Sequence, residues 1–203
     1  MTLDDADRRL VRLFTAGVLG KFDEVLRVRA GAAPGEPDRR WRETVLQVHV
    51  FAGFPRLVEL YSVLDSGGGL GALDPDEVEA RGPDTGERDR ARGRALFERI
   101  YRDDSTGVRA MLARHHPDFA GWIEEHAYGR VLARSGLGAD RRELLAVAAL
   151  AALGQGRQLA SHVRGALRCG AQRSEIDGAL ECVADLLDPE RLASARRVVE
   201  RFA

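Results

Sequence analysis

The sequence predicts an all-helical protein, and three features of its 203 residues support that class. Apolar residues recur every three or four positions, as at Leu10 and Leu13, which is the spacing of one helix face. Glycine and proline fall at the ends of these periodic runs, where they commonly end and begin helices. Val and Ile occur singly, without the alternation that a strand requires. We therefore expect helices throughout and no sheet.

The first part of the chain should contain four helices. The acidic start DDAD suits a helix N-terminus, and Gly20 closes the first helix. A second helix is expected from Phe22 to Ala30, and a third carries WRETVLQVHVFAG. Pro55 opens the fourth, since the missing N–H of proline would be unpaired in a first helical turn anyway.

Residues 66–93 have the composition of a flexible linker, with many glycines, two prolines and a high charge. We therefore expect a partial N-terminal repeat at 1–65, a linker at 66–93 and a helical domain at 94–203. The segment SGGGLG lacks the preceding strand and following helix of a phosphate-binding loop.

The helices of the second part follow from the same signals. They are expected at ALFERIY, TGVRAMLARH, FAGWIEEHAYGRVLAR, RRELLAVAALAAL and GRQLASHVRGALRC, the last capped by Gly170. Ser174, with Asp177 three residues on, has the spacing of a capping box for the next helix. Asp188 and Pro189 should begin the final helix.

Composition narrows the function classes. The net charge is −1, so no basic excess indicates nucleic-acid binding. No apolar run approaches the roughly 20 residues of a membrane span, and the N-terminus lacks an apolar signal core, so we expect a cytoplasmic protein without a membrane partner. The two cysteines, Cys169 and Cys182, form no CxxC pair, and no Cys/His set has zinc spacing. We expect no metal site and treat both cysteines as small buried side chains.

When residue 8 is aligned with residue 142, two segments, 8–64 and 142–198, match in outline without a gap. The helix-ending Gly20 falls on Gly154, and the helix-starting Pro55 falls on Pro189. The agreement of these two positions across four elements, more than the few identities, predicts an internal repeat of tandem helical segments.

The most informative spacing is counted from Glu143, with Gln155 at +12, Gln158 at +15 and His162 at +19. It resembles the carboxymuconolactone decarboxylase family. In the alkylhydroperoxidase D branch of that family, a glutamate is followed at the same distances by the two cysteines of a CxxC pair and by a histidine. The resemblance implies a helical fold and a homo-oligomer, a dimer or trimer in our expectation. It is fullest over about residues 94–202.

Two further motifs accompany the resemblance. Tyr128, Gly129 and Arg134 match an upstream aromatic-Gly and Arg of the decarboxylase branch, although Trp usually fills the place of Tyr128. The family's aromatic-x-Gly-x-Pro turn is present only in the first repeat, as FAGFP at residues 51–55.

The missing thiols argue against peroxidase chemistry, because a dithiol peroxidase needs one cysteine to attack the peroxide and another to resolve the product. Decarboxylases of the family use no cofactor and act on a small dicarboxylate lactone. The resemblance then implies His162 as proton carrier, oriented by Glu143, with Gln158 one turn away. Arg134 and Arg164 could hold a carboxylate, for which a guanidinium is well shaped, and Tyr128 could line the substrate site.

Other interpretations stay open. The chain could be a non-catalytic helical assembly or small-ligand-binding protein, in which His162 is a hydrogen-bonded residue at the edge of an apolar stripe. Glu143 could simply favour a helix dipole. His49 lies within an apolar run and should be packed. Arg-rich pieces such as RDRARGR are usually solvated. A pocket holding His162 and an Arg would favour an enzyme, whereas apolar filling would favour assembly.

Overall fold

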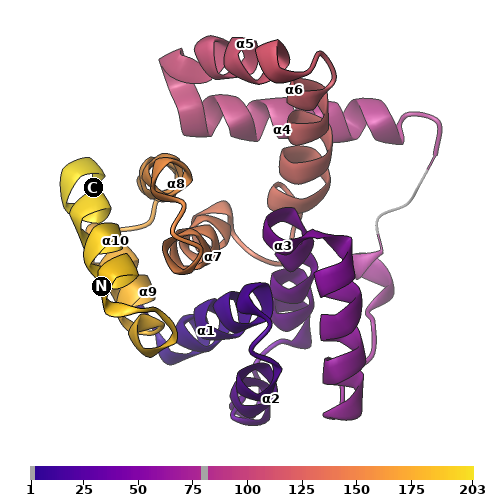
Figure 1. Ribbon diagram of the computed structural model, residues 1–203. Coiled ribbons are helices and arrows are strands. Elements are labelled where there is room, and N and C mark those ends of the chain that lie inside the picture. Colours follow the sequence, from indigo (N-terminus) through magenta and orange to yellow (C-terminus); the bar gives the residue numbers. More distant parts are fainter. Residues whose placement is uncertain (1–2, 79–81) are drawn as a thin grey trace. The chain divides into compact units, whose positions relative to one another are not determined.

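The computed structural model describes residues 3–78 and 82–203, which form helices and turns and contain no strand (Figure 1). The all-helical class is therefore confirmed. The chain divides into two compact units: unit 1 combines Met1–Asp74 with Gly136–Ala203, and unit 2 is Pro75–Ser135.

Unit 1 contains the helices of both predicted repeats. They are α1 (Asp5–Leu19), α2 (Phe22–Ala30), α3 (Asp38–Ser66), α7 (Ala139–Ala152), α8 (Gly156–Cys169), α9 (Arg173–Glu181), the 3-10 turn η4 (Ala184–Leu186) and α10 (Pro189–Phe202). Local signals set many of these bounds. Gly20 and Gly170 adopt the left-handed conformation that ends α1 and α8, and the Asp188 side chain accepts the backbone N–H of Arg191 to cap α10.

One predicted cap is wrong. Helix α9 begins at Arg173 rather than Ser174, and its capping box pairs Gln172 with Glu175. The Glu175 carboxylate accepts the backbone N–H of Gln172 at 2.8 Å. A glutamine side chain can accept at this position as the Ser, Thr, Asp and Asn of the usual pattern do, so the pattern alone misplaced the start.

Helix α3 is interrupted where the sequence predicts a boundary between two helices. Gly53 has φ 81° and ψ 166°, outside the helical region, and Pro55 follows it. A side chain at residue 53 would be strained at this positive φ, so glycine is required there. The break separates the first half of α3, which carries Phe51, from a second half with a different direction.

Unit 2 contains η1 (Pro75–Glu77), α4 (Thr85–Tyr101), η2 (Arg102–Asp104), α5 (Ser105–His115), α6 (Phe119–Trp122) and η3 (Ile123–Leu132). The last is a π-helix, so the helix expected from Phe119 is α-helical only in its first turn. α4 and η3 cross in backbone contact: a Cβ added at Gly93 would lie 1.9 Å from the Glu124 carbonyl oxygen, and one at Gly129 would lie 2.0 Å from that of Asp89.

The predicted linker is wrong for residues 85–93, which form the start of α4. High charge suggested solvation, but Asp89 is fully buried and pairs with Arg92 at 3.0 Å and Arg130 at 3.2 Å. These charges therefore belong to a folded interface. Linker residues 79–81 lie outside the described residues.

The two units also differ from the predicted domain division. Residues 94–135 belong to unit 2, while 136–203 share unit 1 with the N-terminal segment. Composition shows where the chain is hydrophilic, but it does not show which apolar faces pack together. In unit 1 a single hydrophobic core includes Leu13, Phe14 and Leu60 from the first half and Leu144 and Ile176 from the second.

Helix bounds in unit 1 agree with the alignment of residues 8–64 on residues 142–198. In that register, the start of α1 at Asp5 corresponds to the start of α7 at Ala139, and the start of α2 at Phe22 to that of α8 at Gly156. Gly20 lies after α1 and Gly154 lies after α7, and both glycines have positive φ, 72° and 70°. These agreements support the internal repeat, which stays an interpretation.

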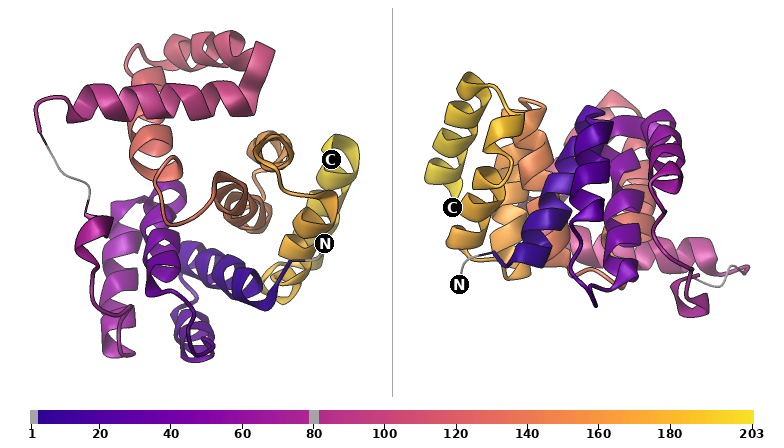
Figure 2. Two further views of the ribbon diagram at one scale, coloured as in Figure 1. Left: turned by 180° about the vertical axis from the view of Figure 1, so that it is seen from behind. Right: turned by 90° about the horizontal axis from the view of Figure 1, so that it is seen from below.

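A buried ion pair joins the two halves of unit 1. Arg142 on α7 is 1% exposed, and its Nη2 donates to Oε2 of Glu43 on α3 at 2.6 Å. Gln47, also on α3, donates to the Arg142 carbonyl at 3.0 Å. α1 packs against both of these helices (Figures 1 and 2). The cluster joins α3 to α7, and α1 packs on both.

We predict that Glu43→Leu destabilises the protein by about 3–5 kcal/mol, because it leaves the buried guanidinium of Arg142 without its carboxylate. The double variant Glu43→Leu, Arg142→Met should recover most of that loss. Urea unfolding followed by circular dichroism measures both. The exposed Arg173–Asp177 pair, 3.0 Å apart, is the control, since Asp177→Asn should cost less than about 1 kcal/mol. Equal losses in the single and double buried variants would contradict the role of charge.

Candidate functional site

The α7–α8 hairpin brings Glu143 and His162 together. Gly154 in the connecting turn has φ 70°, which glycine adopts without strain, and α8 then runs back along α7. Glu143 lies near the start of α7 and His162 near the middle of α8. Both side chains are thus roughly 12–16 Å from the turn along their helices, on opposite sides of the same interface.

His162 and Glu143 form a direct contact in which Nδ1 of the imidazole lies 2.8 Å from Oε2 of the carboxylate. Glu143 is 1% exposed, whereas 12% of the His162 side chain reaches solvent. Because a carboxylate accepts and does not donate, the proton of the neutral imidazole sits on Nδ1. Nε2 is then the ring atom that can accept another proton.

The ring of Phe51, from the first half of α3, packs beside this pair with its centroid 5.9 Å from that of His162. Phe14 on α1 in turn meets Phe51 edge-on at 5.6 Å. Sequence reasoning noted Phe51 only as part of the FAGFP turn and missed it as a neighbour of His162. The FAGFP turn itself was the available signal, because its first aromatic residue is the one that packs beside His162.

The two glutamines at the family's thiol positions are exposed. Gln155 precedes the first turn of α8, and Gln158 lies one turn before His162. Across residues 3–78 and 82–203, no hydrogen bond joins Gln158 to His162. Gln158 could meet a bound molecule from the solvent side of the helix, but it does not orient the imidazole here.

The residues expected to bind substrate lie in different surroundings. The Arg164 guanidinium stacks 5.0 Å from the ring centroid of Phe202 on α10. Residues 162 and 164 project about 200° apart on one helix, so Arg164 and His162 occupy different faces.

Tyr128 and Arg134 belong to unit 2. Tyr128 is buried, shares a 3.2 Å hydrogen bond between its hydroxyl and that of Tyr101, and meets Phe97 edge-on at 5.1 Å. Arg134 donates to the carbonyl of Glu77 at 3.2 Å. Within unit 2, Tyr128 thus connects η3 to α4, and Arg134 connects the segment after η3 to η1.

No group of three or more His, Cys, Asp and Glu side chains in residues 3–78 and 82–203 is arranged to hold a metal ion. None of the helices there has the length and hydropathy needed to cross a membrane.

Cys169 is buried and Cys182 half-buried, and both remain thiols outside any disulfide. Burial raises the pKa of the Cys182 thiol to about 12. The thiolate is the reactive form of cysteine, so Cys182 is an inert thiol at neutral pH. His49, which lies in the apolar run of α3, is 8% exposed and stacks on Phe54. Burial lowers the pKa of this histidine.

Comparison with known proteins is consistent with this geometry. Residues 117–201 match the model of the carboxymuconolactone decarboxylase family, a range that covers α6, η3, α7 to α9 and all but the last residue of α10. The chain is also 28% identical, over 136 residues, to "Peroxisomal protein 2" of Schizosaccharomyces pombe (strain 972 / ATCC 24843). That match covers 66% of this chain and 62% of the relative, so the chain spans less than two thirds of the relative's length.

We predict that the protein has no thiol-dependent peroxidase activity, because Gln155 and Gln158 stand at the thiol positions and the pKa of Cys182 is raised to about 12. Peroxide consumption with a dithiol reductant is the measurement. The variant Gln155→Cys, Gln158→Cys restores the pair at the start of α8 and should gain activity. Wild-type turnover that disappears in a Cys169→Ser, Cys182→Ser variant would contradict the prediction.

Proposed function

Residues 117–201 belong to the carboxymuconolactone decarboxylase family, and from this we propose that the chain is a cofactor-free acid–base enzyme acting on a small carboxylate or lactone. The contact between His162 and Glu143 carries the proposal. Its chemistry needs one group that exchanges a proton with the substrate and one that fixes that group, and this pair can supply both.

Each member of the pair has a distinct part in the proposal. The Glu143 carboxylate is buried and accepts from Nδ1, so it holds the imidazole in one tautomer and stabilises the imidazolium when Nε2 takes a proton. Phe51 packs beside the imidazole, with the two ring planes tilted by 60°. His162 is the catalytic residue, and Glu143 is a positioning residue.

In a decarboxylation, the bond between carbon and the departing CO2 breaks, and its electron pair moves onto the conjugated carbonyl of the lactone. The resulting carbanion then takes a proton at carbon, which the Nε2–H of protonated His162 supplies. A guanidinium that binds a remaining carboxylate of the substrate would orient it, and Arg164 is the candidate from unit 1. In the free protein Arg164 stacks on Phe202. Gln158 is proposed to contact substrate from its exposed position.

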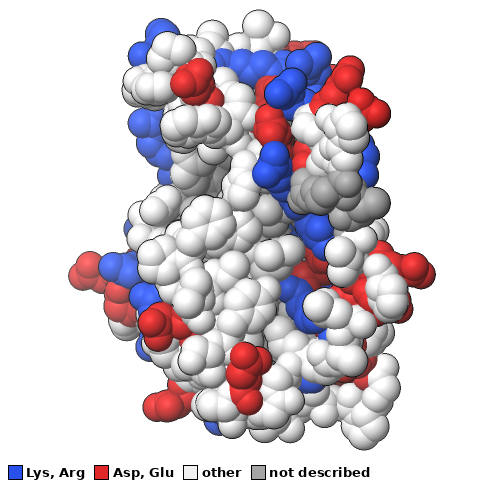
Figure 3. All heavy atoms as spheres, turned by 90° about the vertical axis from the view of Figure 1, so that its right-hand side faces the viewer, with Lys and Arg blue, Asp and Glu red and all other residues white. Residues whose placement is uncertain are grey.

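We also propose that the protein forms a homo-oligomer through the second half of α3. Phe54 and Val58 lie one turn apart there and are 63% and 66% exposed. Figure 3 faces the side of the molecule at the right of Figure 1, where this half-helix lies, and shows a broad uncharged area in its lower part. This surface also favours the alternative function, assembly without catalysis. A cytoplasmic location stays a prediction.

We predict that His162→Ala lowers kcat/KM for carboxymuconolactone by about 10²–10⁴, the usual contribution of a general acid–base residue. Release of CO2 and uptake of solvent deuterium into the product are the measurements. Glu143→Gln keeps a neutral hydrogen-bonding side chain and should shift the pH profile as well as lower the rate. His116→Ala is the control, since that side chain is 58% exposed and lies in unit 2. Equal rates in wild type and His162→Ala, or no turnover by wild type of this lactone and a panel of related carboxylates, would leave the assembly function.

Self-association has its own test. Phe54→Ser with Val58→Ser should reduce the molar mass seen by light scattering at micromolar concentration, because it removes the exposed apolar pair from α3. Val78→Ser in unit 2, where Val78 is 65% exposed, is the matched control and should leave the mass unchanged. A monomeric wild type would contradict the proposal.

A further inference from the structure

Two guanidinium groups lie against one aromatic ring where α8 packs beside α10. The guanidinium carbon of Arg164, on α8, is 5.0 Å from the centroid of the Phe202 ring, and that of Arg201, on α10, is 5.2 Å from it. The two guanidinium carbons are therefore no more than about 10 Å apart. Because Phe202 packs against the core of unit 1, its ring gives both cations a common support.

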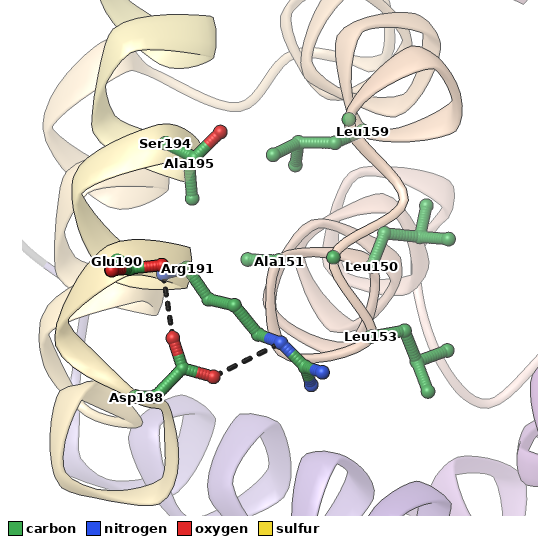
Figure 4. A pocket seen from close by; sticks show the side chains of 11 residues that line it. Leu150, Ala151, Leu153, Leu159, Asp188, Glu190, Arg191, Ser194 and Ala195 are labelled. Atoms are coloured by element: carbon green, nitrogen blue, oxygen red, sulfur yellow. Dashed lines mark hydrogen bonds and ion pairs between the residues drawn. The ribbon is translucent and has the colours of Figure 1, made fainter.

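No carboxylate neutralises these two cations. Within residues 3–78 and 82–203, neither Arg164 nor Arg201 takes part in an ion pair. Arg191, at the start of α10, differs in this respect, because its Nε pairs with Asp188 at 3.0 Å (Figure 4). Like charges that are held close together repel each other, and an anion bound between them would remove that repulsion.

The positive charge extends along both helices. α8 and α10 together carry seven arginines and two glutamates, in a chain whose net charge is −1. Arg157 lies two turns before Arg164 and projects only about 20° away from it, on the same face of α8. A Cβ added at the preceding Gly156 would lie 4.0 Å from Val198, which is one turn before Arg201. Arg157 therefore adds to the positive potential on this side of unit 1.

The arrangement of the two guanidiniums favours a phosphate group over a carboxylate. A guanidinium that stacks on an aromatic ring keeps its N–H donors in its own plane, where they can still meet an anion. One guanidinium satisfies both oxygens of a carboxylate. A phosphate monoester has three terminal oxygens and up to two negative charges, so it can accept from two guanidiniums at once.

The surroundings favour a soluble ligand over a lipid surface. In the described part of the chain, none of the exposed large hydrophobic side chains belongs to α8 or α10. A helix that binds in a membrane interface needs such side chains beside its cations, because apolar burial supplies much of the binding free energy. The phosphate group should therefore belong to a small molecule in solution.

We propose that Arg164 and Arg201, supported by Phe202, bind the phosphate group of a small, soluble phosphate monoester. Arg164 and His162 occupy different faces of α8, so this site does not depend on the reaction proposed above. While phosphate is bound, Arg164 stays beside Phe202, and only the unliganded protein can offer this guanidinium to a substrate carboxylate.

Three variants test the two guanidiniums and their support. Arg201→Ala removes one guanidinium from an exposed position and leaves Phe202 in place. Phe202→Leu keeps an apolar side chain against the core but removes the flat ring on which both guanidiniums stack. Arg196→Ala is the matched control, because Arg196 is another exposed arginine of α10 and projects about 140° away from Arg201.

Sodium phosphate and glycerol 3-phosphate are titrated separately into 15N-labelled protein at low ionic strength, which limits the screening of exposed charges. Sodium acetate at equal ionic strength is the control anion. NMR follows the backbone amides and the arginine Nε–H signals. We expect saturable shifts at Arg164 and in the last turn of α10 in wild type and in Arg196→Ala. Binding should be about tenfold weaker in Arg201→Ala, which lacks one set of charged donors, and weaker also in Phe202→Leu.

Four outcomes would overturn the proposal. They are the absence of saturable shifts at these positions, equal affinity for acetate and phosphate, wild-type affinity in either Arg201→Ala or Phe202→Leu, and a loss in Arg196→Ala equal to that in Arg201→Ala. Sedimentation with vesicles of phosphatidylcholine and phosphatidic acid distinguishes the two sources of a phosphate monoester. Wild-type protein that binds these vesicles but neither soluble phosphate would show that the ligand is a lipid headgroup, against the proposal.

Discussion

A buried arginine is tolerated only when a carboxylate and hydrogen-bond acceptors compensate its charge. Arg142 is such a residue in unit 1. Its partners, Glu43 and Gln47, both come from α3, in the first half of the unit. The pair therefore fixes α3 against α7. That placement sets Phe51, two turns beyond Glu43 on the same helix segment, beside His162. The candidate site depends on a polar contact deep in the core as much as on the hairpin that carries its two titratable groups.

In the register of the interpreted repeat, the two halves of unit 1 carry different residues at matching positions. The position equivalent to Phe51 is Asp185, and the one equivalent to Gln158 is Glu24. Arg12 bridges these two acids, with its Nη1 2.6 Å from Asp185 and its Nε bonded to Glu24. Arg12, Glu24 and Asp185 thus form an ion-pair cluster at one of the two matching places. The other place carries His162, whose side chain is 12% exposed.

The sequence predicted those features that depend on one residue's own backbone preferences. Gly20, Gly170 and Pro189 mark helix ends because their allowed φ values and missing groups act locally. The start of α4 was missed because Asp89 becomes buried only through contact with η3, which lies far along the chain. The spacing from Glu143 to His162 suggested a site, but the approach of the two side chains depends on the hairpin, and Phe51 depends on packing between repeats. Long-range contacts of this kind leave little trace in local composition.

Main-chain atoms form the crossing of α4 and η3 at Gly93 and Gly129. These atoms are the same whatever the side chain. Such a joint requires glycine at two positions, and the rest of α4 adds side-chain contacts with η3, such as Asp89 with Arg130 and Phe97 with Tyr128. The range that matches the family begins at residue 117, after α4, and so includes only one of the two crossing helices. The matched range therefore leaves out the helix whose main chain receives Gly129, so the place of η3 in unit 2 depends on residues outside that range.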